Sequence, residues 1–509
     1  MFTLSPKKIA YACCPARLHP MLDRIEASNI GYRLVRGTFW SIFGIVLSRG
    51  LILAASILVA RIMGKEVFGE YGIIRSTVNM FVVFAGFGLG MTATKHVAEF
   101  RDHDPARAGR IVAISGYFAM IAGLLVAAGL LIFAPLLAEK SLNAPHLAGV
   151  LRIGAIILFI NALNGAQTGA LAGFEAFKTI AYVNLGVGLA SFPLLVSGAY
   201  FGGLEGAVWA LGLNMAINWL LNHIALRKEV ERFNIPLTNF RDCFREWPIL
   251  WKFSLPVTLG GIMMGPVMWA CNAILVNRPD GYGQMGLFTA ALTFHSIILF
   301  VGTTLNGPLL SMLSHTGRKV SDQFGRINIL SSWMVAMMIV VPLLCFPEIV
   351  ELLFGKEYSG RQFRITFSLI MLYTCILMYK QGLARVLAVN NLMWWGFFSN
   401  TIWAIVLVAS AWTLTRWGAA GLALSYLIAY IVNTLIVIPV YYRKNLIPPS
   451  TMISWQTIVT WLTIFSLLGL SYWDVPMAYK AICFVLAAII ISYCMMKILR
   501  PAKTTVPLL

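Results

Sequence analysis

Acidic residues are scarce in this sequence. Asp and Glu number 20 among 509 residues, against 39 Lys and Arg, and 12% of the chain is charged whereas 59% is hydrophobic. Soluble domains average about 25% charged residues, so an ordinary soluble domain is excluded. The net charge of +19 would suit nucleic-acid binding, but basic residues between apolar runs are what positive-inside topology produces. We predict a polytopic membrane protein that binds no nucleic acid.

Motifs of enzymes, pumps and metal sites are also missing. The eight cysteines show no CxxC or Cys/His spacing, and we interpret most of them as small apolar residues. For Cys13 and Cys14, in a basic arm, a lipidation or redox role and a solvated bystander role both stay open. No GxxxxGK[ST] loop is present, which argues against an ATP-driven pump. We predict no catalytic residues, no cofactor and no metal, and hence no enzyme.

Long apolar runs follow one another along the chain, and they are consistent with about fourteen crossings of about 20 residues each. The predicted fold class is an all-α polytopic membrane protein with two pseudo-symmetric six-helix lobes plus two C-terminal helices. Most Lys and Arg residues fall on one side, so both termini are expected in the cytoplasm. The predicted domains are a cytoplasmic basic arm (1–36), an N-lobe (37–226), a cytoplasmic linker (227–248), a C-lobe (249–441) and two final helices with a short cytoplasmic tail (442–509).

The two lobes show an internal repeat at an offset of about 215 residues. The matches pair Gly69 and Gly72 with Gly283 and Gly286, Asn184 with Asn400, Gly203 and Gly206 with Gly418 and Gly421, and Asn218 with Asn433. An even number of crossings restores orientation, so the six helices repeat in parallel. Two such lobes around a central site are typical of transporters that work by alternating access.

The first apolar stretch, 37–61, carries Arg49 at its midpoint. At about 1.5 Å per residue Arg49 lies roughly 18 Å from either end, further than its side chain reaches. A central arginine costs about 2.5–3.5 kcal/mol on insertion scales and by default marks a substrate path. The next helix, expected over 71–92, carries Arg75 one turn inside the membrane, with Asn79 on the same face. These cations predict an anionic ligand. The alternatives are a buried ion pair for Arg49 and a structural, snorkelling role for Arg75.

The second half supplies further candidates. Lys380, its only deep cation, either contacts the ligand or snorkels, and His295 is either a ligand contact or a hydrogen-bonded packing residue. The candidate substrate-binding residues are Arg49, Arg75, Asn79, Lys380, His295 and Asn306. Proline and glycine favour bends in helices. Gating or hinge roles are therefore expected for Pro256, Gly260, Gly261, Gly265, Pro266, Gly307 and Pro308.

Asp and Glu are nearly absent from the interiors of the predicted spans. An exporter that exchanges drugs for protons or Na⁺ usually needs a buried carboxylate. A glycan polymerase or ligase would be expected to have a long extracytoplasmic loop, and the longest outer loop here covers only about 348–364. Both classes stay open as alternatives, but the sequence favours a carrier of an anion.

Three short elements resemble one family. They are GKEVFGEYG at 64–72, LAGFEAFKTIAYVNLG at 171–186 and FGKEYSG at 354–360. With the plan of two lobes and two extra helices, the chain resembles the polysaccharide and O-antigen flippases of the multidrug/oligosaccharidyl-lipid/polysaccharide (MOP) exporter superfamily. The resemblance implies a flippase that moves undecaprenyl-pyrophosphate-linked oligosaccharide repeat units across the bacterial cytoplasmic (inner) membrane for surface polysaccharide biosynthesis, by alternating access. It also implies a cationic central cavity, into which Arg49 and Arg75 fit.

The implied partners are the polyprenyl-pyrophosphate-linked oligosaccharide, the lipid bilayer and, as candidates, the polysaccharide polymerase and chain-length machinery. The motifs do not choose between O-antigen, exopolysaccharide, capsule or another glycan, nor between H⁺, Na⁺ and membrane potential as the energy source. The alternative functions are a multidrug or toxin exporter of the same superfamily and, after it, a membrane-bound glycan polymerase or ligase.

Overall fold

The computed structural model describes residues 29–236, 240–255, 258, 261–304, 309, 322–389, 392–444, 446–448, 451–473 and 475–499. Every regular element in these residues is a helix, and no strand occurs among them. A helix satisfies its backbone hydrogen bonds within one segment, which a membrane-spanning chain requires because lipid offers no partners. The predicted all-α fold is confirmed.

The first helix, α3 (Asn29–Gly86), contains two crossings joined by a sharp turn at Gly64. Gly64 has φ 74° and ψ 172°, a conformation that glycine adopts without the steric cost of a Cβ. The second crossing therefore begins at Lys65, earlier in the chain than the sequence suggested.

This second crossing also ends before the predicted boundary. Phe87 (φ 41°) and Gly88 (φ 63°) break it and start α4 (Leu89–Phe100). Because the crossing starts at Lys65, Arg75 lies almost three turns inside it at about 3.6 residues per turn. Arg75 is therefore further from the start of its helix than the expected boundary at residue 71 implies.

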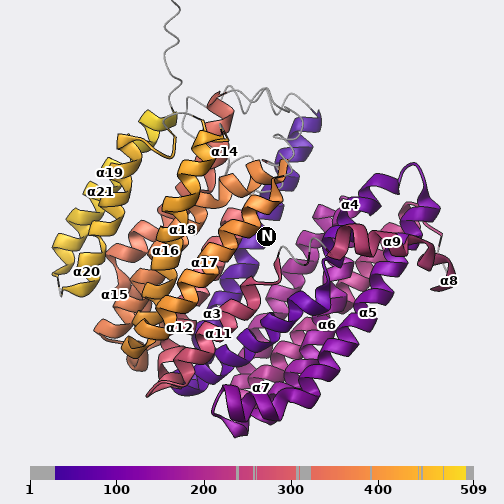
Figure 1. Ribbon diagram of the computed structural model, residues 1–509, viewed down its shortest axis with the longest axis horizontal. Coiled ribbons are helices and arrows are strands. Elements are labelled where there is room, and N and C mark those ends of the chain that lie inside the picture. Colours follow the sequence, from indigo (N-terminus) through magenta and orange to yellow (C-terminus); the bar gives the residue numbers. More distant parts are fainter. Residues whose placement is uncertain are drawn as a thin grey trace, which may run out of the picture.

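Three further long helices complete the N-lobe (Figure 1). They are α5 (Pro105–Leu136), α6 (Ala148–Gly173) and α7 (Phe177–Arg232), with the short turns η2 (Leu137–Ser141) and η3 (Pro145–Leu147) between α5 and α6. Like α3, α7 holds two crossings, joined at Gly203 (φ 54°). Asp104 starts α5 by accepting a hydrogen bond from the Arg107 backbone N–H.

The segment that follows the N-lobe remains beside it. Its short helices are α8 (Phe240–Cys243), η4 (Phe244–Glu246), α9 (Trp247–Ile249) and η5 (Leu250–Ser254). Figure 1 shows α8 and α9 next to α4 and α5. The next described helix, α11, packs against the C-lobe helices α12 and α17, so the seventh crossing starts on one lobe and ends on the other.

The C-lobe and the two C-terminal crossings follow in chain order. The C-lobe contains α11 (Met264–Val276), α12 (Gly281–Thr304), α14 (Asp322–Cys345), α15 (Pro347–Phe354), η6 (Lys356–Tyr358), α16 (Arg361–Val389), α17 (Met393–Leu414), η7 (Thr415–Trp417) and α18 (Gly418–Arg443). After it come α19 (Trp455–Ser466), α20 (Leu468–Tyr472) and α21 (Met477–Leu499), at the outer edge of the C-lobe in Figure 1.

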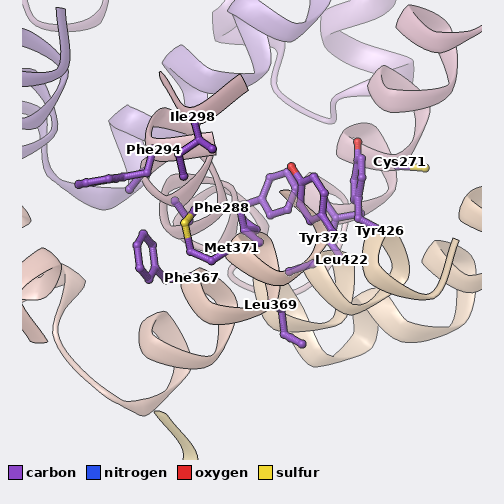
Figure 2. Close-up of a cluster of buried hydrophobic side chains, with 14 of the residues drawn as sticks. Cys271, Phe288, Phe294, Ile298, Phe367, Leu369, Met371, Tyr373, Leu422 and Tyr426 are labelled. Carbon is purple, nitrogen blue, oxygen red and sulfur yellow. The ribbon is translucent and has the colours of Figure 1, made fainter. Parts of the chain in front are cut away.

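Aromatic rings fill the C-lobe core between α12, α16 and α18. Tyr426 packs against both Phe288 and Tyr373, with ring centroids 5.8 Å and 5.3 Å away, and Figure 2 shows the three side chains close together. All three side chains are almost fully buried. Such close packing leaves these side chains little room to rearrange.

The described helices account for the predicted number of crossings. Eight helical stretches are long and apolar enough to cross a membrane, and two of them, Phe177–Arg232 and Trp394–Arg443, hold two crossings each. With both crossings of α3 and the shorter apolar helices included, the described part of the chain holds the 14 helices expected for two lobes plus two. The predicted architecture is confirmed.

We name the two ends of the molecule by their connections. The turn end carries the glycine turns at Gly64, Gly203, Gly355 and Gly418, all with positive φ. The linker end is the opposite one and carries the connection before α5 and the short helices α8 to η5.

Candidate functional site

Arg49 lies on the first crossing of α3, at the boundary between the lobes. Its side chain is half-buried, and its guanidinium carbon is 3.7 Å from the centre of the Phe300 ring on α12. Next to it, the buried Ser48 hydroxyl donates to the Asn184 carbonyl on α7 (2.9 Å). Within the described residues Arg49 has no ion pair and no hydrogen bond. Its N–H donors are therefore available to an anion.

Arg75 lies at a similar depth on the second crossing of α3. At a rise of 1.5 Å per residue, Arg75 is about 16 Å and Arg49 about 22 Å from the Gly64 turn. The Arg75 guanidinium is 5.6 Å from the Tyr71 ring centre, and in the described part of the chain it has neither an ion pair nor a hydrogen bond. Asn79, one turn further on, is exposed. The structure thus places Arg49 and Arg75 within about one or two helical turns of each other in depth, and neither has an ion pair with another described residue.

The neighbours of Arg75 bind the C-lobe. Asn272 Nδ2 on α11 donates to Ser76 Oγ (2.8 Å), and Trp269 Nε1 donates to Thr77 Oγ1 (2.9 Å). Both arginines therefore lie on segments in contact with the C-lobe, as a substrate path between two lobes requires.

Lys380 on α16 has a partner within its own lobe. Its ammonium contacts Asn433 Oδ1 on α18, and Asn433 Nδ2 donates in turn to the Ser399 carbonyl on α17 (2.6 Å). Three C-lobe helices are joined by this chain of contacts. The pair places a cation inside the C-lobe with an amide rather than a carboxylate as its partner.

His295 on α12 lies in the C-lobe core. It is buried, and its Nδ1 is 2.8 Å from Thr374 Oγ1, while its ring centroid is 5.0 Å from that of Tyr373. These contacts are those of a packed, hydrogen-bonded residue. Nothing in them brings His295 to Arg49.

Some predicted hinge residues lie where the seventh crossing changes lobe. Gly261 precedes a short turn, α11 starts at Met264, and Pro266 falls in its first turn. A Cβ on Gly265 would lie 3.4 Å from Met80 Cα, in ordinary contact with α3. The other predicted positions lie outside the described residues: Pro256, Gly260, Asn306, Gly307 and Pro308.

The repeated glycines form a close lobe contact at the turn end. A Cβ on Gly69 would lie 1.9 Å from the Tyr282 carbonyl oxygen, and one on Gly286 would lie 1.9 Å from the Lys65 carbonyl oxygen. The two contacts are reciprocal, so Gly69 is the counterpart of Gly286 and Lys65 that of Tyr282. The sequence repeat had paired Gly69 with Gly283, one turn away. We call this contact between α3 and α12 the glycine crossing.

Two of the signature elements meet beside the glycine crossing. Glu357 Oε2 accepts a hydrogen bond from the Lys65 backbone N–H (2.8 Å), and the buried Tyr358 hydroxyl donates to the Ala60 carbonyl (3.4 Å). Burial raises the pKa of Tyr358, so it remains a neutral donor. The GKEVFGEYG and FGKEYSG elements therefore hold the lobes together at the turn end.

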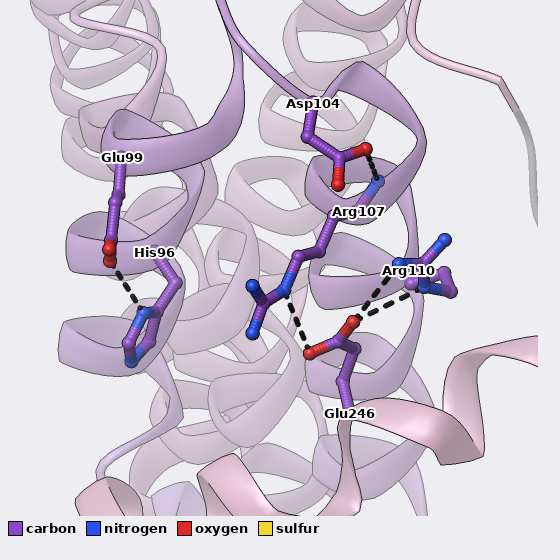
Figure 3. A network of polar contacts seen from close by, with 6 residues as sticks. All are labelled: His96, Glu99, Asp104, Arg107, Arg110 and Glu246. Atoms are coloured by element: carbon purple, nitrogen blue, oxygen red, sulfur yellow. Dashed lines mark hydrogen bonds and ion pairs between the residues drawn. The ribbon is translucent and has the colours of Figure 1, made fainter.

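A carboxylate fixes the linker end to the N-lobe. Glu246 is buried between two arginines of α5, with its Oε2 3.2 Å from Arg107 Nε and its Oε1 3.2 Å from Arg110 Nη2 (Figure 3). Nearby, the Thr92 and Ser254 hydroxyls are 2.7 Å apart. These contacts explain why the seventh crossing starts on the N-lobe.

Sequence reasoning missed three of these residues. Phe300 carried no signal, because an aromatic residue in an apolar span is ordinary. Glu246 was read as part of a charged linker. Arg385 counted as a loop cation, yet it is buried on α16 and donates to Asn328 Oδ1 (2.8 Å) and Ser332 Oγ (3.2 Å). One sequence signal could have been used. Glu246 lies three residues before the apolar run that starts at 249, and Arg107 and Arg110, three residues apart, are available to pair with it.

Solved structures share this fold. The chain matches an inward-closed structure of the lipid II flippase MurJ at 14% identity and a TM-score of 0.65, over 90% of this chain and 98% of that one. It matches an inward-facing multidrug resistance MATE family transporter of the MOP superfamily at 17% identity and 0.59, over 80% and 99%. A MOP superfamily transporter from Pyrococcus furiosus matches at 18% identity and 0.54, over 81% and 95%. At these identities the likeness establishes the fold.

No curated protein sequence matches the chain significantly. The family model described as "Polysaccharide biosynthesis protein" matches residues 34–314, more than half of the chain. The matched region contains both crossings of α3, Arg49, Arg75 and the glycine crossing. The chain therefore belongs to the polysaccharide biosynthesis protein family, and it has the fold of the transporters of the MOP superfamily.

Proposed function

We propose that this protein is a flippase that moves a polyprenyl-pyrophosphate-linked oligosaccharide repeat unit across the cytoplasmic membrane for surface polysaccharide biosynthesis. The observation that carries the proposal is Arg49, a cation at the boundary of the lobes whose donors have no hydrogen-bond partner among the described residues. Keeping such a charge at mid-membrane costs about 2.5–3.5 kcal/mol, a cost that an anionic ligand offsets. Arg75 supplies a second cation at a similar depth.

The headgroup chemistry supports this choice of ligand. A pyrophosphate carries roughly two negative charges, and the planar arginine fork binds phosphate oxygens through two parallel hydrogen bonds. The exposed amide of Asn79 is suited to sugar hydroxyls. The polyprenyl tail remains in lipid beside the protein, so only the charged and sugar parts need a polar path. The polysaccharide polymerase and chain-length machinery are proposed as partners that receive the unit.

The lobe contacts support alternating access. The glycine crossing and the Glu357–Lys65 contact close the turn end. If both termini are cytoplasmic, as the charge distribution predicts, the turn end faces outward and this conformation receives substrate from the cytoplasm. Release then requires these contacts to separate.

A multidrug exporter is the alternative on the same fold. Exchange of drugs for protons or Na⁺ usually depends on a carboxylate in the membrane interior. In the described crossings Asp and Glu occur only near the ends, for example Glu70 and Glu99. The site therefore favours an anionic substrate.

The test measures lipid-linked oligosaccharide in cells that lack the protein. We expect complete repeat units to accumulate facing the cytoplasm, protected from an external glycosidase, and surface polysaccharide to disappear. The wild-type protein should restore export and Arg49→Gln should not, at equal abundance in the membrane. An unchanged lipid-linked pool together with increased drug sensitivity would favour the exporter and remove the role given to Arg49.

A further inference from the structure

Phe300 is the contact that the structure gives to Arg49, and it comes from the opposite lobe. We propose that Phe300 is a positioning residue that holds the Arg49 guanidinium in place for the anionic headgroup. This inference rests on the proposed function and adds a specific residue to the site. Four observations carry it.

The N-lobe fixes the direction of Arg49. Ser48 is buried against α7, where its hydroxyl donates to the Asn184 carbonyl. Gly188 leaves the space for it, since a Cβ there would lie 2.1 Å from Ser48 Oγ. With Ser48 held against α7, Arg49 is about 100° further around the helix and leaves the N-lobe face. The side chain is thereby directed toward the C-lobe.

The C-lobe fixes Phe300 in a comparable way. Ile298, two residues earlier on α12, is 1% exposed and lies in the C-lobe core (Figure 2). Two residues correspond to about 200° around a helix, so Phe300 faces away from that core. Gly302 packs α12 closely against Met378 of α16. The ring of Phe300 is therefore presented to α3 by a helix that is firmly attached to its lobe.

The geometry suits a guanidinium that must remain available. At 3.7 Å from the ring centre, the Arg49 guanidinium carbon lies over the face of the ring. A guanidinium stacked on an aromatic ring contacts it through the flat face of the guanidinium. The N–H groups at the edge of the guanidinium then remain free for phosphate oxygens. Within the described residues Phe300 contacts no other aromatic ring, so its face is left to Arg49. A carboxylate at this position would instead occupy the donors and cancel the charge.

The contact also depends on the arrangement of the lobes. Arg49 belongs to α3 and Phe300 to α12, and these helices meet at the glycine crossing. A movement that separates them removes Phe300 from Arg49. The protein would thus bind the headgroup more tightly in the conformation seen here than after the lobes separate, which is the difference in affinity that a transport cycle needs.

The experiment measures binding of undecaprenyl diphosphate in phosphatidylcholine nanodiscs. A cation–π contact corresponds to about a 2- to 30-fold change in an equilibrium constant. We expect Phe300→Leu to weaken binding about 5-fold, and Phe300→Tyr, which keeps a ring face, to restore it to within about 2-fold. The matched control is Phe133→Leu on the exposed face of α5, which should bind as the wild type does. Equal affinities for Phe300→Leu and the wild type would overturn the inference.

A double-variant cycle separates positioning from a structural role. If Phe300 acts through Arg49, Phe300→Leu should have no further effect on binding in an Arg49→Gln background. An equal loss in both backgrounds would overturn the inference. The proposed function is tested separately, because it requires Arg49→Gln alone to weaken binding. Wild-type binding by Arg49→Gln would refute it. Loss of binding in Arg49→Gln with no change in Phe300→Leu would refute the role of Phe300 and leave the proposed function standing.

Discussion

The arginines at the linker end and the arginine at the lobe boundary have opposite surroundings. Arg107 and Arg110 share the carboxylate of Glu246, so their charge is compensated and they fix a chain segment to the N-lobe (Figure 3). Arg49 has an aromatic ring in place of a carboxylate, and its donors are unoccupied in the described part of the chain. A compensated cation stabilises the fold. We propose that a cation in the membrane interior with no partner among the described residues, such as Arg49, serves binding.

Arg385 shows that burial in a crossing does not by itself distinguish a structural arginine from one that binds a ligand. It too is buried in a crossing, but its guanidinium donates to Asn328, Ser331 and Ser332. Its donors serve packing between α14 and α16. Arg49 differs because no described residue accepts a hydrogen bond from it. The two arginines therefore differ in the partners of their donors as well as in depth.

The largest expected effect comes from giving Arg49 a carboxylate. Phe300→Glu should form an ion pair with Arg49 and convert it into a structural cation like Arg110. Removing the binding charge should lower transport of a lipid-linked pyrophosphate by about 100-fold or more, since loss of one buried charge contact costs about 2–5 kcal/mol. Transport into proteoliposomes measures this. Phe300→Gln, which is polar but uncharged, is the control and should retain much more activity. Equal losses in both variants would argue against charge compensation.

The glycine crossing should show the next largest effect. A methyl group at Gly69 or Gly286 would collide with a backbone carbonyl of the other lobe, so α3 and α12 must separate. We expect Gly69→Ala to shift the lobes toward the conformation that is open at the turn end. Distances between spin labels at Lys140→Cys and Lys356→Cys, one on each lobe, should lengthen.

The matched control for this substitution is Gly129→Ala on α5, where no atom lies within 4 Å of the added Cβ. It should leave the distances unchanged, and alanine should slightly favour the helix. If Gly69→Ala gave the wild-type distances, the glycine crossing would not control the lobe arrangement.

A smaller and purely structural effect is expected at the linker end. Glu246→Gln leaves Arg107 and Arg110 without their shared carboxylate and should lower the free energy of unfolding by about 1–3 kcal/mol. Thermal unfolding in detergent micelles measures the loss. Arg245→Gln next to it, on a side chain that is 78% exposed, is the control and should change little. Identical melting temperatures for the two variants would contradict the role given to Glu246.

The smallest effect concerns pH at the turn end. Burial raises the pKa of Glu351 on α15, although the Gly360 N–H and Arg364 oppose the shift. A carboxyl group whose pKa is higher in the folded protein binds protons more readily there, so it stabilises the fold as pH falls toward the unfolded pKa. The melting temperature of the wild type should therefore rise relative to that of Glu351→Gln between pH 7 and pH 5. A constant difference would show that the group titrates normally.

Composition and periodicity were sufficient for much of the architecture. Apolar run lengths predicted the crossings, and repeated glycines revealed the two lobes, because membrane helices must be long and apolar and because close helix contacts need small residues. Arg49 could be proposed as a site residue on similar grounds, because a charge in an apolar run is costly.

Contacts between distant segments could not be read from the sequence. Phe300 is an ordinary apolar residue until α12 places it against Arg49. The pairing of Gly69 with Gly286 rather than Gly283 depends on which faces of two helices meet, and the matches one turn apart were equally good in sequence. The distance of Arg75 from the start of its helix was underestimated because the turn at Gly64 starts the second crossing earlier than hydropathy indicated.

The central claim is that Arg49 binds the charged headgroup without supporting the fold. The most direct measurement is the initial rate at which a polyprenyl-pyrophosphate-linked oligosaccharide becomes accessible to an external glycosidase in proteoliposomes. It should be made together with thermal unfolding of the same preparations. The account predicts that Arg49→Gln lowers the rate about 100-fold with an unchanged or higher melting temperature, and that Arg49→Lys retains part of the rate. A wild-type rate in Arg49→Gln, or a rate lost only because the protein unfolds, would contradict it.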